Sequence, residues 1–378
     1  MHGVPSVADW TNLVHRLFPP ETAASWDRVG LQVGDPSAPV STVTVCLDAT
    51  IATLEEARAA GAGLVVSHHP LIFRPLQAVR TDEPVGGLVA KALASRVALL
   101  ACHTNFDADP RSTSYPVAKL LGLRECRPLE AAAEPAEVKL VTFCPLEATE
   151  RVLEALAGAG AGVIGDYTRC SFRVRGTGTF VPGAGARPAI GEREVLNAVE
   201  EDRLEVVVPA AAAPRALAAL RAVHPYEEVA VDVYPLSPHG VRGFGTVGDL
   251  PAPLALGELA GLVREGLPSP LLRFAGDEAR TVRRVAVCGG GGGEYVAAAS
   301  AAGAQCLISG DLSHHAATEA MARGLALIDA GHAATEAAAL PALAERLRAS
   351  ASAEGWQADV LVSSLPADPF RGGGSDGR

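Results

Sequence analysis

The chain has 378 residues, enough for two or three domains with separate cores, and its formal charge of −11 excludes a broad basic surface for nucleic acid. Seven dispersed cysteines are typical of reduced thiols in a cytoplasm rather than of a disulfide framework. No signal peptide opens the chain and no apolar run is long enough to span a membrane, so we expect a cytoplasmic globular protein.

The predicted elements form two segments with the same order of strands and helices. Strands are predicted at 43–50, 63–70 and 97–107 in the first segment, and at 283–293, 305–315 and 325–336 in the second, with helices between them. Cys46 and Ser67 are separated by the same interval as Cys288 and Ser309. Strands that alternate with helices indicate mostly parallel sheets. We therefore predict an α/β protein with two similar lobes from an internal duplication.

The residues between the two segments show a different pattern. Residues 127–243 give strand and helix signals in the order β-α-β-β-α-β, which predicts an inserted ferredoxin-like α+β domain. The first α/β lobe is then expected at 1–126 and the second at 244–370. The glycine-rich tail, 371–378, is expected to be disordered.

Histidines and carboxylates follow three of the predicted strands. They are His68, His69, His103, Asp107, His332 and Glu336. Because sites in open α/β folds form at the carboxyl ends of strands, these side chains should converge. Imidazoles mixed with carboxylates favour zinc, iron, manganese or nickel over calcium, and five or six ligands are too many for one tetrahedral ion. We predict two divalent metal cations per chain, bridged by a carboxylate.

Each group also has a simpler interpretation. His68 and His69 can serve one site only if the backbone turns at Pro70; otherwise one caps and the other packs in the core. His332 and Glu336 are expected to lie one helical turn apart on the same face of a helix. They are either metal ligands or an ordinary pair on the surface. Either Glu336 or Asp107 can act as the bridge.

Two histidines are candidates for moving a proton. His315 is the first, and His103 is the second, although His103 is also a candidate ligand or an orienting group. Asp311 aligns with His69 in the repeat, and it either orients a ligand histidine or caps a helix. His314 is expected to be a solvated helix residue.

The glycine run at 289–293 lies between a predicted strand and a predicted helix. Its backbone N–H groups can cradle a phosphate, although the lysine of a P-loop is missing. Alternatively, the glycines allow the backbone to approach the cleft closely. Trp26 and Asp27 either line the mouth of the cleft or pack in the ordinary way.

Three motifs together carry a family resemblance: SHHPLIF at 67–73, HTNFDA at 103–108 and GHAATE at 331–336. The chain resembles the Nif-three-like dinuclear metal-centre family, whose bacterial members are often labelled type 2 GTP cyclohydrolase I homologues. The resemblance implies a homohexamer with an insert similar to PII and CutA proteins. It also implies the metal ligands His68, His69, Asp107, His332 and Glu336. The chain has Arg28 where the family usually has asparagine, which leaves the substrate open.

These observations predict a metal-dependent hydrolase. The family label implies opening of the purine ring of GTP, and a phosphoesterase acting on a nucleotide or another small phosphate ester is the close alternative. The rival hypothesis is a non-catalytic, metal-binding regulatory or scaffold protein whose inserted domain senses a small molecule. In either case the expected partners are small molecules and further copies of the chain.

Overall fold

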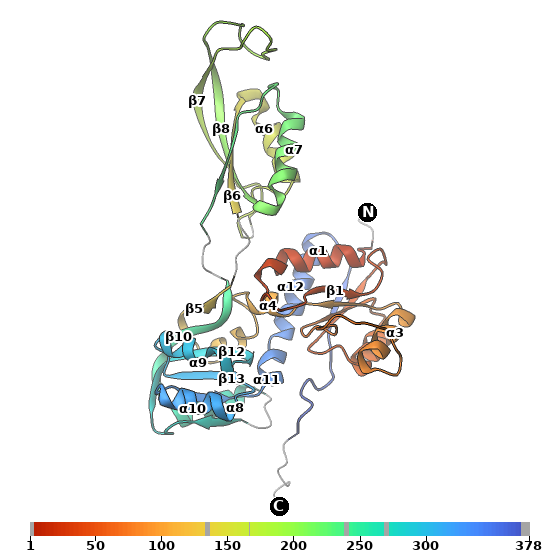
Figure 1. Ribbon diagram of the computed structural model, residues 1–378, viewed down its shortest axis with the longest axis vertical. Coiled ribbons are helices and arrows are strands. Elements are labelled where there is room, and N and C mark those ends of the chain that lie inside the picture. The colour runs from red at the N-terminus through yellow and green to blue at the C-terminus, as the bar shows by residue number, and fades with distance from the viewer. Residues whose placement is uncertain (1–3, 133–136, 166, 238–241, 268–271, 372–378) are drawn as a thin grey trace, which may run out of the picture. The chain divides into compact units, whose positions relative to one another are not determined.

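The computed structural model describes residues 4–132, 137–165, 167–237, 242–267 and 272–371 (Figure 1). The chain forms two compact units, Met1–Ala133 with Gly240–Arg378, and Glu134–His239. Among the described residues, no helix is both long enough and apolar enough to cross a membrane. All but Arg371 of the predicted tail, 371–378, lies outside the described residues.

The larger unit contains two sheets, each with its own helices, which we call the first and second lobes. The sheet of the first lobe has the order β1 (Gly30–Val33), β4 (Ala98–Ala101), β3 (Leu64–Ser67), β2 (Thr42–Cys46) and β15 (Asp359–Val362). Only β1 is antiparallel to its neighbour. One face is covered by α1 (Val7–Leu17) and α12 (Leu340–Ala353), and the other by α2 (Ile51–Ala59) and α3 (Pro84–Ser95).

The sheet of the second lobe has three parallel strands at its centre. Its order is β11 (Arg273–Ala275), β14 (Ala326–Asp329), β13 (Cys306–Gly310), β12 (Thr281–Gly291), β10 (Gly243–Ala255) and β5 (Arg124–Ala131). One face is covered by α5 (Tyr115–Leu120) and α8 (Leu256–Gly266), and the other by α9 (Val296–Ala301) and α10 (His314–Ala322). The continuous burial of β13 and β14 explains why these strands read as unbroken apolar runs.

Two short helices lie where the chain passes between the lobes, α4 (Thr104–Asp107) and α11 (His332–Ala337). After α4 the chain joins the second lobe through α5 and β5, and after α11 it returns to the first lobe through α12 and β15. The predicted lobe boundaries, 1–126 and 244–370, do not follow these crossings. The reason is that the apolar face of α12, including Leu343 and Leu347, completes the core around Trp10, and β15 extends the parallel sheet beside β2.

The smaller unit is a four-stranded antiparallel sheet with the order β7 (Phe172–Phe180), β8 (Asn197–Pro209), β6 (Glu137–Pro145) and β9 (Val231–Pro235). Helices α6 (Thr149–Gly158) and α7 (Ala213–Val223) pack on one face around Leu140, Leu156 and Leu204. This order is the ferredoxin-like one. The unit is shorter than the predicted insert, 127–243, because β5 pairs with β10 in the second lobe.

The described residues also include short 3-10 helices. They are η1 (Pro20–Thr22), η2 (Leu146–Ala148), η3 (Ala210–Ala212) and η4 (Gly293–Tyr295).

Candidate metal centre

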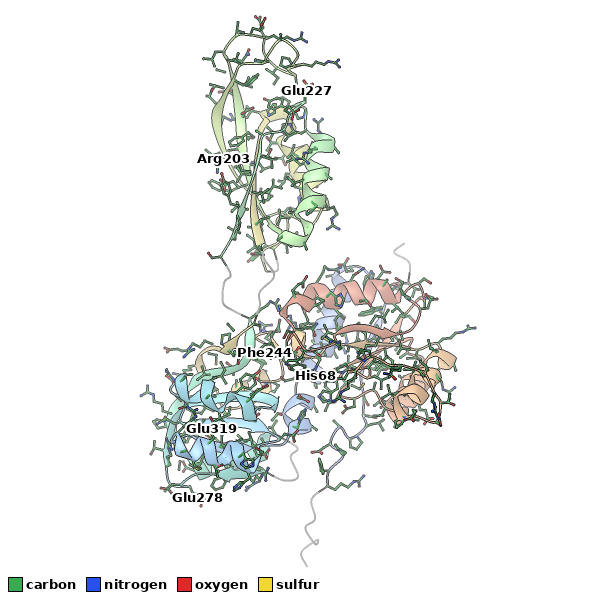
Figure 2. The ribbon with its side chains drawn as sticks, in the orientation of Figure 1. His68, Arg203, Glu227, Phe244, Glu278 and Glu319 are labelled. Carbon is green, nitrogen blue, oxygen red and sulfur yellow. The ribbon has the colours of Figure 1, made fainter. Side chains whose placement is uncertain are left out.

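His68 lies where the lobes of the larger unit meet (Figure 2). Both it and the adjacent His69 reach one cluster of polar side chains. Strand β3 ends at Ser67, and the Ser67 hydroxyl donates to the carbonyl oxygen of His69 at 2.8 Å. Strand alternation therefore no longer applies to His68 and His69, and their ring centroids lie 5.1 Å apart. The side chain of His68 is fully buried, and that of His69 is 25% exposed.

The other members of the cluster come from the two crossing helices. His332 and Glu336 lie one turn apart on α11, with His332 Nε2 3.1 Å from Glu336 Oε2. Asp107 ends α4, and its Oδ1 accepts a hydrogen bond from the Thr113 hydroxyl at 2.7 Å. The lobe crossings thus bring ligand-type side chains from distant parts of the sequence into one place.

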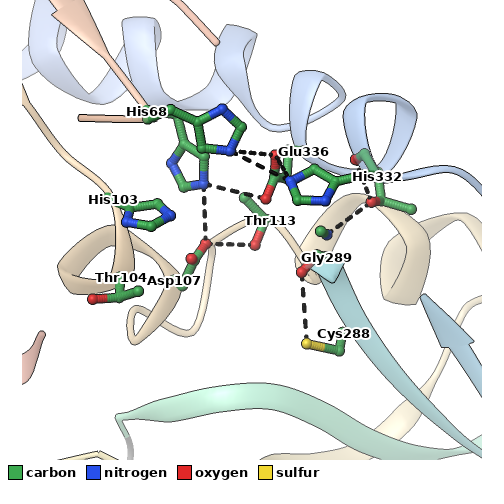
Figure 3. A network of polar contacts seen from close by, with 12 residues as sticks. His68, His103, Thr104, Asp107, Thr113, Cys288, Gly289, His332 and Glu336 are labelled. Carbon is green, nitrogen blue, oxygen red and sulfur yellow. Dashed lines mark hydrogen bonds and ion pairs between the residues drawn. The ribbon is translucent and has the colours of Figure 1, made fainter. Parts of the chain in front are cut away.

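The carboxylate of Glu336 lies between two groups of donor atoms (Figure 3). Its Oε2 is 3.1 Å from Nε2 of both His69 and His332. Its Oε1 is 3.5 Å from His68 Nε2, which is 3.7 Å from Asp107 Oδ1. Glu336 therefore presents one oxygen to each group, as a bridging carboxylate does.

Each histidine of the cluster is held through its Nδ1 atom. Asp48 holds His69 at 2.8 Å, Asp311 holds His332 at 2.8 Å, and Asp27 holds His103 at 2.9 Å. The carbonyl oxygen of Cys102 holds His68 at 3.1 Å. Such contacts fix the ring orientation and leave the other nitrogen for a metal ion, as in carboxylate–histidine–metal arrangements.

The carboxylates control the charge of the imidazoles. Burial by itself lowers the pKa of His69, but Asp48 and Glu336 outweigh it and raise that pKa to about 10. Contact with Glu336 raises the pKa of His332 to about 9 despite partial burial, with a further contribution from Asp311. Burial raises the pKa of Glu336, but the surrounding histidines outweigh it and hold that pKa well below its usual range. The site therefore favours a positive charge beside Glu336.

The donor set fits divalent metal ions. His68 Nε2 and Glu336 Oε2 are buried, and among the described residues they face other members of the cluster: Oε2 lies 3.1 Å from two imidazole nitrogens, and His68 Nε2 lies 3.5 Å from Glu336 Oε1 and 3.7 Å from Asp107 Oδ1. Two groups have donor atoms within 4.8 Å of one another, His68 with His69 and His103, and His69 with His332 and Glu336. Atoms 3.1 to 3.4 Å apart, as in the second group, can share one cation bound at about 2.0–2.1 Å from each.

The glycine run lies directly beside the carboxylate. A Cβ atom at Gly290 would come within 2.1 Å of Glu336 Oε1, and the φ of Gly290 is +73°. The Gly289 N–H donates to Ser114 and the Gly290 N–H to Thr335, so these donors are already used. The contacts favour the close-approach interpretation over a phosphate cradle.

Not every predicted residue is in the cluster. His315 is exposed in the first turn of α10, and among the described residues its ring contact is with His314, at 5.8 Å between centroids. Ser313 caps this helix, whose first-turn residues His314 and His315 are exposed, and proton transfer by His315 stays a prediction. Asp48 was missed, although it precedes His69 by the 21 residues that also separate Asp311 from His332.

A pocket of about 610 Å³ opens beside His69 and His332. Arg273 lines it, and its guanidinium donates to Asp329 at 2.8 and 3.0 Å. Near His103, Trp26 is 52% exposed and Phe73 is 44% exposed, with ring centroids 5.9 Å apart. The cluster is thus flanked by space for a small molecule and by an exposed aromatic pair.

Fold and site define a two-lobed α/β protein with a candidate histidine-rich metal site at the lobe junction and a ferredoxin-like insert. The chain belongs to the Duf34/NIF3 (NGG1p interacting factor 3) family, whose sequence pattern matches residues 5–369. It is 40% identical over 369 residues to the GTP cyclohydrolase 1 type 2 homolog of Mycobacterium tuberculosis, covering 96% of each chain. It is 36% identical over 359 residues to the homolog of Halalkalibacterium halodurans, covering 95% of this chain and 96% of the relative.

Solved structures agree with this assignment. A Bacillus cereus protein related to NIF3 matches with a TM-score of 0.84 and 36% identity, over 98% of this chain and 99% of the other. A Staphylococcus aureus protein matches with a TM-score of 0.74 and 27% identity, over the same shares. The mixed α/β fold of the NIF3 structures is therefore also the fold of this chain.

Proposed function

We propose that this protein is a hydrolase that uses two divalent metal cations per chain, either zinc, iron, manganese or nickel, to act on a nucleotide or a small phosphate ester. The main support for this proposal is the position of Glu336, whose two carboxylate oxygens face different groups of donor atoms. His69 and His332 would hold one cation with Oε2. His68 and Asp107 would hold the other with Oε1.

When bound, a pair of divalent cations lowers the pKa of a shared water toward neutrality and polarises the bond under attack. The protein's part is to hold the donors in place. The Asp48 and Asp311 carboxylates fix the rings of His69 and His332, and the Thr113 hydroxyl fixes Asp107. Because these donor side chains are already oriented, less rearrangement of the site is needed during the reaction.

His103 is the residue that we expect to move a proton. Burial raises the pKa of Asp27, but hydrogen bonds from His103 and Thr104 outweigh it and lower that pKa to about 2. Asp27 is therefore ionised at neutral pH and orients the His103 ring through Nδ1. The His103 ring lies 5.1 Å from that of His68 and 5.5 Å from that of His69, between centroids.

The surroundings support a substrate with a flat ring. Trp26, with its ring centroid 6.0 Å from that of His103, offers an exposed face for stacking a base. The relatives' name, GTP cyclohydrolase 1 type 2 homolog, favours opening of the purine ring of GTP. Phosphate-ester cleavage is the second candidate, because paired cations suit displacement at phosphorus.

Turnover by metal-loaded protein tests the proposal. We expect it to open the GTP ring or to release phosphate from one of a panel of phosphate esters. Glu336→Gln should abolish this activity while the elution volume on size exclusion stays that of the wild type. The matched control is Glu319→Gln, an exposed residue of α10. Failure of fully loaded protein to turn over any substrate would favour a regulatory or scaffold role.

We also infer that the two lobes arose by duplication. The parallel strands β4-β3-β2 and β14-β13-β12 occupy corresponding positions in their sheets. In the same correspondence Cys46 of β2 matches Cys288 of β12, and Ser67 of β3 matches Ser309 of β13, with 21 residues between the cysteine and the serine in each lobe. These correspondences support the inference.

A further inference from the structure

The ferredoxin-like unit contains a pocket of its own, with a volume of about 450 Å³. Its walls are the end of β7, the loop that follows it through Ile190, and the loop between α7 and β9. The two loops are tied together, because the backbone N–H of Arg187 donates to Glu227 Oε2 at 2.7 Å. Figure 2 shows Glu227 beside the loop that joins β7 to β8. The pocket is large enough for a small organic molecule.

A buried carboxylate is built into this pocket. Glu201 of β8 lines it and is only 7% exposed. On the neighbouring strand β7, Gly176 pairs with Glu201 and Gly178 pairs with Val199. A Cβ atom at Gly178 would come within 2.1 Å of Glu201 Oε2. The absence of a side chain at Gly178 therefore makes room for the carboxylate.

The carboxylate of Glu201 is only partly satisfied by the protein. Its Oε1 accepts a hydrogen bond from the Tyr226 hydroxyl at 2.7 Å. Among the described residues, neither a second hydrogen bond to this carboxylate nor an ion pair with lysine, arginine or histidine is formed. A buried carboxylate without a cationic partner is unfavourable, and a cation supplied from outside would compensate for that cost.

The rest of the lining fits the same kind of ligand. Phe143, Phe180 and Tyr226 line the pocket, although aromatic residues make up only 4% of the chain. Glu227 and Glu228 add negative charge. Across the whole lining, three carboxylates face the single guanidinium of Arg187, so anionic ligands are disfavoured. Aromatic rings beside a carboxylate recognise ammonium groups through cation–π attraction and a charged hydrogen bond.

We infer that this pocket binds a small organic ammonium ion with an aromatic or alkyl body, whose charged nitrogen pairs with Glu201. The body of the ligand would lie among Phe143, Phe180 and the apolar loop after β7. The site lies wholly within the ferredoxin-like unit, so this inference is independent of the hydrolase proposal.

Calorimetric titration of the full-length wild-type protein with three matched probes tests the inference. They are 2-phenylethylammonium, 2-phenylethanol and phenylacetate, which share a body and differ in charge. We expect saturable binding of the ammonium, about tenfold weaker binding of the alcohol and weaker binding still of the carboxylate. Equal affinity for ammonium and alcohol, or no saturable binding of the ammonium, would overturn the inference without need of any variant.

Variants then locate the site. Glu201→Gln should weaken ammonium binding by about tenfold and leave the alcohol unchanged, so that charge selectivity disappears. Glu200→Gln is the matched control, because this exposed neighbour on β8 is outside the pocket lining. Unchanged ammonium affinity in a folded Glu201→Gln variant, or an equal loss in Glu200→Gln, would also overturn the inference.

Discussion

The Nε2 atoms of His69 and His332 lie 3.4 Å apart, although 263 residues separate the two histidines in the chain. The Nδ1 atom of each ring contacts an aspartate, Asp48 for His69 and Asp311 for His332. When both rings are protonated, each Nε2–H can donate to Glu336 Oε2, which lies 3.1 Å from both nitrogens, whereas neutral rings at this distance can share a metal ion. The pair therefore makes the junction between the lobes sensitive to both protons and metal ions.

Metal content should depend on this pair. We expect His69→Ala and His332→Ala each to lower the bound metal from about two ions per chain to about one, because each removes a donor from the Oε2 side of Glu336. Elemental analysis of protein purified without chelator measures this. His314→Ala, on the exposed start of α10, is the control and should keep the full content. Full metal content in either cluster variant would contradict the assignment.

The orienting aspartates should matter without being ligands. Asp48→Ala and Asp311→Ala should each weaken metal affinity by roughly 10- to 100-fold, because the ring that each holds becomes free to rotate. Competition with a chromogenic chelator gives the affinity. Asp359→Ala, an exposed residue of β15, should leave it unchanged. An affinity equal to that of the wild type in both cluster variants would argue against the orienting role.

Metal binding should release protons at neutral pH. The pKa of His69 is about 10 and that of His332 about 9 in the metal-free protein, so both rings are charged at pH 7.5. Because a metal ion binds only the neutral imidazole, apparent affinity should rise with pH up to about pH 9–10. Calorimetry in two buffers with different ionisation enthalpies counts the protons released. An enthalpy that is the same in both buffers would show that the rings are already neutral.

The metal-free protein should lose stability at alkaline pH. The folded-state pKa values of His69 and His332 lie above the value of about 6.5 for an unfolded chain. Their contribution to the free energy of unfolding is therefore complete below pH 6.5 and disappears as the pH rises through about 9 and 10. Thermal unfolding of chelator-treated protein at pH 7 and pH 9.5 measures the loss. In Glu336→Gln this dependence should be smaller, and an undiminished slope there would assign it to other groups.

Glycine at position 290 should be required for the site. Gly290→Ala places a Cβ within 2.1 Å of Glu336 Oε1 and should reduce both metal content and stability. Gly303→Ala is the matched control, because Gly303 has a φ of +75° but open space around it. The control should show only the backbone cost of about 1–2 kcal/mol. Equal unfolding free energies for the two variants, with full metal content in both, would contradict this account.

Local patterns in the sequence were enough to predict the candidate ligands. His68, His69, Asp107, His332 and Glu336 each follow an apolar run that becomes a buried strand. Parallel strands place their carboxyl ends along one edge of a sheet, so residues that follow them are brought together whatever the connections elsewhere. The ferredoxin-like order of the insert was likewise predictable, because its strands and helices are regular and its pairing is local to that segment.

Tertiary structure decided what depends on packing between distant segments. Neither the sequence of α12 nor that of β15 specifies which lobe will bury it; the apolar surface around Trp10 and the free edge of β2 do so. The roles of Asp48 and His315 also depend on tertiary structure. Asp48 lies in the loop after β2 and His315 in the first turn of α10, and the sequence does not specify which way either segment faces. Periodicity determines which residues are buried, whereas the partner that buries them is settled only when the lobes meet.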